Sequence, residues 1–378
     1  MAELAAGLGF GWSAVQNVFF VMDLADRIKP VVPEEAKTAV KIVLGSGSGT
    51  TTAGGPAPHV ALWDDNGSRI GQYTPGKKDK IDQGSVKDIV IDHTQTVPKY
   101  SQADPQYVMV SLNSDDAICI SVIAVANKKI DGTFLGDIGA KCGQTWFESE
   151  NPVGNKDEKP KCVWLDGNHD NGINARALSF HLRDLAPVDA KLAQYKDNPD
   201  TLCKSTPRYS FWGDLLPNGI PPFFDPPLKY NDGNGGDVDL SLVLDDPNMP
   251  WDKSATMHPT KGPKRRMRRD GQALGKRNVS MNRDPSHLII SEHDNSDVRG
   301  ICESETSYGW DIVSTKQKLF CDMEHKQLYP VCCEKVREKC FDVERRTLVG
   351  GLGVDKRDPE VARLRFERGY NSTAHWRM

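Results

Sequence analysis

The stretch KPKCVWLDGNHDNGINARALSFHLRDL, residues 159–185, combines strand signals with a polar cluster, and the rest of the chain is organised around it. Cys162–Leu165 is an apolar run of strand length, and Ala177–Leu182 is a second run that alternates. Between the two runs lie the residues that look most like a metal site: Asp166, Asn168, His169 and Asp170. We therefore expect two strands joined by a polar loop at the centre of the fold.

Upstream of this centre, short runs rich in β-branched and aromatic residues predict further strands. These runs are residues 39–44, 59–63, 69–73, 87–92, 106–112, 117–126, 133–135 and 145–147. Asn66-Gly67 lies between two of them and indicates a hairpin, because both residues tolerate a positive φ. The run 117–126 is apolar on both faces, which is typical of a central strand. Short strands at close spacing, with no helical periods between them, predict an antiparallel β-sandwich over residues 39–185.

The N-terminal segment, residues 1–38, is expected to hold an amphipathic helix and a linker. Apolar residues recur at helical spacing up to Ile28, and Pro30 and Pro33 end the helix. Three roles are open for this helix: it docks on the body of the protein, lies on a membrane surface, or binds a partner. A homo-oligomer formed through residues 1–28 is one form of partner binding. No apolar run approaches the length of a transmembrane helix.

Downstream of the sandwich the sequence divides into four segments: a proline- and aromatic-rich strap (186–251) with a short helix near Val188–Tyr195, a basic disordered linker (252–286), a cysteine-rich module (287–356) and a polar C-terminal tail (357–378). The basic linker is a solvated connection, a protease processing site at Lys276-Arg277, or a nuclear-localisation or nucleic-acid patch. The last alternative lacks interleaved aromatic residues, and the net charge of −4 gives no global field that favours nucleic acid. The expected fold class is therefore mainly β: an antiparallel β-sandwich with an N-terminal helix and a small disulfide-rich C-terminal module.

Nine cysteines lie in loop-rich sequence without a CxxC pair, so disulfides are favoured over a zinc site. The candidates are Cys119, Cys142, Cys162, Cys203, Cys302, Cys321, Cys332 and Cys340. The doubled pair Cys332-Cys333 makes the count odd, so at least one thiol is unpaired or bonds another chain. Disulfides predict an extracellular or cell-surface location. The N-terminus lacks a visible signal peptide, which keeps a cytoplasmic location as the alternative.

The turn Gly167-Asn168-His169-Asp170 follows a strand, as in metallophosphoesterases, where a strand delivers Asn and His to a two-metal centre. Gly136-Asp137 could supply a further carboxylate. An upstream Asp-x-His and later paired histidines are missing, and such a fold alternates strands with helices. The alternative is a polar turn in which Asp166 and Asn168 cap backbone groups.

Eight segments resemble a family of filamentous-fungal (ascomycete) proteins that are mostly secreted, contain cysteines and are uncharacterised, and the resemblance covers roughly residues 58–378. The segments are ALWDDNGSRIGQY, GSVKDIVIDHTQ, DAICISVIAV, LGDIGAKCGQTWF, KCVWLDGNHDNGINARALSFHLRD, LCKSTPRYSFWGDLLP, GWDIVSTKQKLFCDMEHKQLYPVC and KCFDVERRTLVG. The resemblance implies an extracellular, disulfide-bonded protein. It implies no activity, cofactor or catalytic residue.

The first functional hypothesis is a non-enzymatic, effector-like binding protein whose ligand is a glycan or a protein. Its sandwich would present three loops, around residues 63–69, 136–146 and 166–174. The candidate ligand-binding residues are Trp63, Asp64, Asp65, Asp137, Trp146, Asp166, Asn168, His169 and Asp170. No catalytic residue, metal or cofactor is predicted. Two alternatives stay open: a metal-dependent hydrolase centred on Gly167-Asn168-His169-Asp170, and a structural, self-assembling protein.

Overall fold

The computed structural model describes residues 36–47, 52–94, 104–151, 159–169, 172–198, 200–238, 281–294, 296–349 and 369–377. The expected N-terminal helix, Asp170, the processing site at Lys276-Arg277 and most of the basic linker lie outside these residues. The described part is mainly β, as the sequence predicts.

The first sheet has the strand order β10-β11-β8-β1-β6, with β9 paired to β8, and every pair in it is antiparallel. Its strands are β10 (Trp146–Phe147), β11 (Cys162–Leu165), β8 (Ile118–Ala126), β1 (Lys37–Leu44), β6 (Val86–Asp92) and β9 (Asp131–Leu135). All nine residues of β8 are buried, and β8 has paired strands on both sides. Its apolar run therefore marks a central strand, as predicted.

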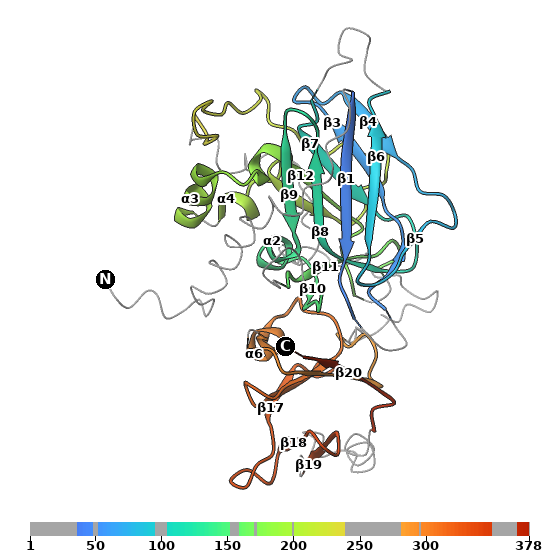
Figure 1. Cartoon of the computed structure of the whole chain (residues 1–378), viewed down its shortest axis with the longest axis vertical. Coiled ribbons are helices and arrows are strands. Elements are labelled where there is room, and N and C mark those ends of the chain that lie inside the picture. Colours follow the sequence, from blue (N-terminus) through green and yellow to red (C-terminus); the bar gives the residue numbers. More distant parts are fainter. Residues whose placement is uncertain are drawn as a thin grey trace, which may run out of the picture.

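The second sheet has the order β13-β12-β7-β3-β4 and is also antiparallel throughout (Figure 1). Its strands are β13 (Tyr209–Trp212), β12 (Ala177–His181), β7 (Tyr107–Ser111), β3 (His59–Trp63) and β4 (Arg69–Tyr73). The sequence indicated all of these except β13, which lies inside the expected strap. A short ladder joins β2 (Gly55–Pro56) to β5 (Lys80–Ile81).

Both sheets contribute side chains to one hydrophobic cluster, which includes Val40 and Ile42 of β1, Val108 and Val110 of β7, and Leu178 of β12. These side chains are fully buried. Burial of apolar area on this scale is the main favourable term in folding, at roughly 25 cal/mol for each Å² removed from water. The two sheets are therefore held together by one shared core.

Short helices surround the sheets: α2 (Gly136–Lys141), the 3-10 turn η3 (Leu182–Leu185), α3 (Asp189–Asp197) and α4 (Asp200–Cys203). Helix α3 confirms the short helix expected near Val188–Tyr195. Residues 213–230, a part of the expected strap, run along the outer face of the second sheet, and from here on the name strap refers to these residues alone. The strap contributes Phe224 and Leu228 to a second apolar cluster with Trp63, Tyr107 and Met109. Its backbone is fixed by side chains of the sheet, because the Tyr107 hydroxyl accepts a hydrogen bond from the Phe224 N–H at 3.0 Å.

The C-terminal part of the chain builds a third sheet, with the order β17-β16-β15-β14-β20, and the separate hairpin β18-β19. Its elements are β14 (His287–Ser291), α6 (Val298–Glu303), β15 (Asp311–Ser314), β16 (Leu319–Asp322), β17 (Gln327–Pro330), β18 (Cys340–Asp342), β19 (Thr347–Val349) and β20 (Ser372–Trp376). This sheet is mixed, because β14 is parallel to both β15 and β20. The sequence did not indicate β20, which lies in the segment expected to be a polar tail.

The C-terminal module docks on the first sheet through aromatic residues. The Trp310 ring lies 5.4 Å from that of Phe147 and 6.2 Å from that of Trp164, measured between centroids. The indole N–H of Trp164 donates to the Tyr308 carbonyl oxygen at 2.8 Å. A Cβ at Gly47 would lie 2.0 Å from the Trp310 ring, so only glycine permits this approach. Side chains from both parts therefore belong to the same hydrophobic cluster.

The eight cysteines expected in disulfides form four: Cys119–Cys162, Cys142–Cys203, Cys302–Cys321 and Cys332–Cys340. Cys333 is free and exposed. The first two bonds close loops of 43 and 61 residues. In the chain-entropy model each such bond stabilises the fold by about 4 kcal/mol. None of the four joins residues 36–238 to residues 281–377.

Candidate functional site

The loops expected to form one binding face are separated by the second sheet. Trp63 at the end of β3 and His181 at the end of β12 both pair with Tyr107, so the turn after Trp63 lies at that end. Ala177 at the start of β12 pairs with Ser111, at the other end of β7. The loop 166–174 leads directly into Ala177 and lies at that opposite end. These two loops therefore do not share a surface.

At the first end, Asp64 shapes the hairpin. Its carboxylate oxygen Oδ1 accepts from the Asn66 N–H at 2.9 Å and from the Ser68 N–H at 2.8 Å, while Gly67 adopts a φ of +75°. Trp63 is buried, and its ring carries the Arg69 guanidinium 5.0 Å from the centroid. Both residues therefore have structural partners.

At the opposite end, the motif Gly167-Asn168-His169 forms a polar turn. Asp166 is fully buried, and its Oδ1 accepts from the Asn168 N–H at 3.3 Å. His169 has a φ of +59°, and its Nδ1 lies 3.0 Å from the Ile173 carbonyl oxygen. These contacts hold the loop in shape.

Of the two remaining candidates, Asp137 lies in α2 and Trp146 contacts the C-terminal module. Asp137 is in the first turn of α2 and accepts from the Lys161 N–H at 3.1 Å, and burial raises the pKa of its carboxyl group. The indole N–H of Trp146 donates to the Ser304 hydroxyl at 3.2 Å. Across the described ranges, no group of three or more His, Cys, Asp or Glu side chains is arranged to hold a metal ion.

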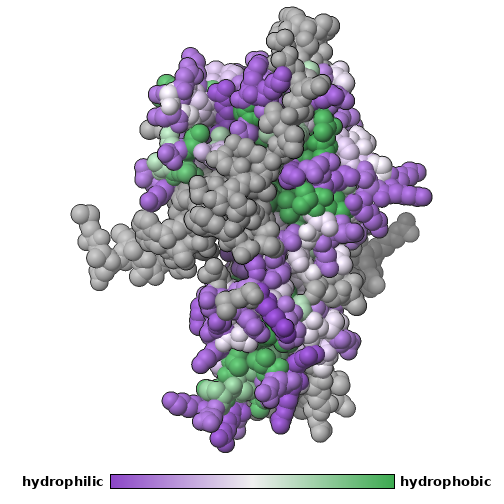
Figure 2. All heavy atoms as spheres, viewed as in Figure 1, coloured by the Kyte–Doolittle hydropathy of each residue, from purple (hydrophilic) through white to green (hydrophobic). Residues whose placement is uncertain are grey.

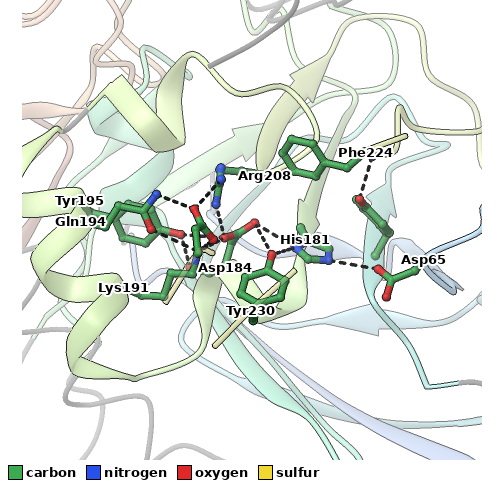
Figure 3. A network of polar contacts seen from close by, with 11 residues as sticks. Asp65, His181, Asp184, Lys191, Gln194, Tyr195, Arg208, Phe224 and Tyr230 are labelled. Atoms are coloured by element: carbon green, nitrogen blue, oxygen red, sulfur yellow. Dashed lines mark hydrogen bonds and ion pairs between the residues drawn. The ribbon is translucent and has the colours of Figure 1, made fainter. Parts of the chain in front are cut away.

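Asp65 belongs to a buried network that the sequence did not indicate (Figure 3). The Nδ1 atom of His181 lies 2.9 Å from the Asp184 carboxylate and 2.8 Å from the Tyr230 hydroxyl. Its Nε2 atom faces the Asp65 carboxylate at 3.6 Å. Asp184 also contacts the cations of Lys191 and Arg208, and Asp237 contacts the same two cations.

The charges of this network balance when His181 is protonated. It holds three carboxylates, those of Asp65, Asp184 and Asp237, against the cations of Lys191 and Arg208. Burial lowers the pKa of His181, but its contacts with Asp184 and Asp65 outweigh burial and raise the pKa above the ordinary value. Burial likewise raises the pKa of Asp184, and the adjacent cations outweigh it, so that this pKa is lowered.

A substrate cannot reach this network, so its role is structural. The His181 side chain is 1% exposed and those of Lys191 and Arg208 are fully buried. Tyr230 comes from the end of the strap, His181 from β12 and Lys191 from α3, so the network ties three segments together. Asp65, with 37% of its side chain exposed, lies at the edge of the network that reaches the surface.

A pocket opens instead on the C-terminal module, between the β16–β17 turn and the β18–β19 hairpin. It is a cavity of about 40 Å³. Three carboxylates line it, from Asp311, Asp322 and Glu324, together with His325 and Arg346. Three rings also line it, those of Phe320, Phe341 and Tyr370. Figure 2 shows hydrophobic residues bordered by hydrophilic ones at this end of the molecule.

Asp311 forms the polar base of this pocket. Its Oδ1 accepts from the Asn282 side-chain amide at 2.7 Å and from the Met323 N–H at 2.8 Å, and its Oδ2 accepts from the Tyr370 hydroxyl at 2.9 Å. Burial and the nearby charges of Asp322 and Glu324 raise the pKa of Asp311 to about 7. A carboxyl group perturbed in this way, inside a concave site, is typical of a functional position.

The residues of this pocket are far apart in the chain, so the sequence does not indicate it. Its residues come from β15, β16, the β16–β17 turn, the β18–β19 hairpin and the segment before β20, and Asp311 and Tyr370 are 59 residues apart. The one local signal is the turn after Cys321, where Asp322 accepts from the Glu324 N–H and contacts the His325 ring at 2.8 Å.

Comparison with known proteins adds no family. A scan against protein-family models finds no match for the chain, and a search of curated proteins finds no similar sequence. None of the described helices has the length and apolar character needed to cross a bilayer.

Proposed function

We propose that the chain is a non-enzymatic binding protein, secreted or displayed at the cell surface, whose ligand is a protein or a glycan. The observation that carries the proposal is the pocket around Asp311. It combines a concave shape, three aromatic rings and polar groups held by their own hydrogen bonds, which is the usual composition of a recognition site. The first two sheets act as a β-sandwich scaffold on which the C-terminal module is mounted.

Four disulfides support the extracellular assignment. Disulfides persist in oxidising compartments, whereas cytosolic thiols are kept reduced. The secreted character implied by the resemblance to a filamentous-fungal family agrees with this location.

Intact mass and ligand screening test the proposal together. Protein from its native source is expected to carry four disulfides and one thiol that can be alkylated without reduction, that of Cys333. The same protein, oxidised and immobilised, is then screened against a printed glycan array and a library of displayed peptides. We expect saturable binding with the ligand recovered chemically unchanged. Nine free thiols, an absence of binding in both screens, or turnover of a bound ligand would each contradict the proposal.

A further inference from the structure

We propose that the pocket around Asp311 receives the ammonium group of a lysine side chain presented by a partner protein. This inference rests on the proposed binding function and names the group that is recognised. Three properties of the pocket carry it: its size, its charge and its apolar walls.

The narrowest part of the cavity suits a small group. A cavity needs roughly 10–15 Å³ of such volume to hold one water molecule, so a cavity of about 40 Å³ holds a group of a few atoms. The end of a lysine side chain, an ammonium nitrogen and its last methylene groups, fits. The rest of an unbranched stem can remain at the mouth of the pocket.

The charge of the cavity selects a cation. Three carboxylates line it, and the only permanent cation among the lining residues is that of Arg346, an exposed residue on the β18–β19 hairpin. His325 contacts Asp322 at 2.8 Å. When Asp311 is ionised, three carboxylates therefore face the single guanidinium of Arg346 and the ring of His325. A compact ammonium group can approach several oxygens at once, whereas the wider guanidinium of arginine needs a planar slot.

The apolar walls suit the lysine stem. The buried Phe320 and Phe341 rings are stacked on each other, with centroids 4.0 Å apart, and the Tyr370 ring meets Phe341 edge-on at 6.3 Å. Leu348 adds an aliphatic surface. The methylene groups of lysine pack on apolar surfaces of this kind.

Binding of the ammonium group should release a proton. The groups that face Asp311 are Asp322 and Glu324 from the β16–β17 turn, Tyr370 before β20, and Asn282 before β14, with His325 and Arg346 at the rim. Because a neighbouring cation favours the charged form of a carboxyl group, the ammonium group lowers the pKa of Asp311. Affinity should therefore rise between pH 6 and pH 8, through the pKa of about 7.

The test is an NMR titration of the full, oxidised chain with Nα-acetyl-lysine methylamide. We expect shifts confined to the C-terminal module. Three probes serve as comparisons: the Nε-acetylated analogue, which is uncharged, the corresponding arginine derivative, and glucosamine. We expect at least tenfold weaker binding of the uncharged analogue and weaker binding of glucosamine. Equal binding of the uncharged analogue, or tighter binding of glucosamine, would overturn the inference.

Two variants with opposite expected signs separate recognition from stability. Glu324→Gln removes a carboxylate from the lining and should weaken lysine binding about twofold to fivefold, the effect of a partly exposed ion pair. Arg346→Ala removes the competing cation and should tighten binding about threefold. Glu344→Gln, an exposed residue of the same hairpin outside the lining, is the matched control and should change nothing. Weaker binding in Arg346→Ala would contradict the charge argument.

The outcomes also distinguish the inference from the proposed function. A chain that binds members of the glycan array or the peptide library, but no lysine derivative, retains its binding function with a different ligand group. A chain that binds neither the libraries nor the lysine derivative loses both.

Discussion

At the scale of single residues, the most unusual feature is the group of fully buried charges between α3 and β13. Removing a charge from water costs several kcal/mol, and this cost is offset only when each charge has close partners. Lys191 and Arg208 each contact both Asp184 and Asp237, which meets that condition. Removal of one member alone would leave a buried charge without its partner, which is the costly case.

Lys191→Met is expected to lower the free energy of unfolding by about 3–5 kcal/mol, because two buried carboxylates then share the single cation of Arg208. The double variant Lys191→Met/Asp237→Leu removes one charge of each sign and should recover much of the loss. Urea unfolding of the two single variants and the double variant measures this coupling. Strictly additive losses would show that the two side chains do not act as a pair.

At the scale of elements, the strands of the first two sheets, apart from β13, were predictable because local sequence dictates them. The Asn66-Gly67 turn and the continuous apolar run of β8 depend only on residues close together in the chain. Strand β20 was not predictable, because a polar segment becomes a strand there only by pairing with β14, about 85 residues earlier. The same limit applies to the candidate sites. Asp65 and His181 are 116 residues apart in the chain, and no local sequence pattern indicates that they are in contact.

The docking element of the C-terminal module is the segment around Trp310, and its removal should uncouple the two parts. Trp310→Ala is expected to cost about 3–5 kcal/mol, because it empties the space between Phe147 and Trp164. Calorimetry should then resolve two unfolding transitions in place of one. Trp310→Phe keeps part of the contact and should retain a single transition at lower temperature. A single, unshifted transition in Trp310→Ala would rule out this role.

At the scale of the whole molecule, several groups bind protons more tightly when the chain is folded. Burial raises the pKa of Asp311 and of Glu148 to about 7, and the pKa of His181 is also raised. For such groups the stabilising contribution is complete below the pKa of the unfolded chain and is lost as the pH rises through the folded pKa. Asp184 acts in the opposite sense, because its lowered pKa stabilises the fold above about pH 4. Stability should therefore be greatest near pH 5.

Thermal unfolding measured from pH 4 to pH 8 tests this profile. The expected fall between pH 5 and pH 7 is on the order of a few kcal/mol, since a shift of one pKa unit corresponds to about 1.4 kcal/mol. The partly buried His59 and His93 and the buried His287 have lowered pKa values and oppose the fall. Asp311→Asn, which keeps the oxygen that accepts from Asn282 and Met323, should flatten the profile. A wild-type profile that rises steadily to pH 8 would contradict the assignment.

Because the disulfides form two separate sets, a cut in the chain would turn unfolding into a process that also separates two molecules. Two bonds lie within residues 36–238 and two within residues 281–377, so a single cut between Val238 and Met281 would leave a heterodimer with no covalent link. Its association would depend on the packing of Trp310 and on the shared core. Dissociation of the cut form would follow mass action, so its melting temperature would fall on dilution, whereas that of the intact chain would not. One peptide bond thus decides whether the stability of this protein depends on its concentration.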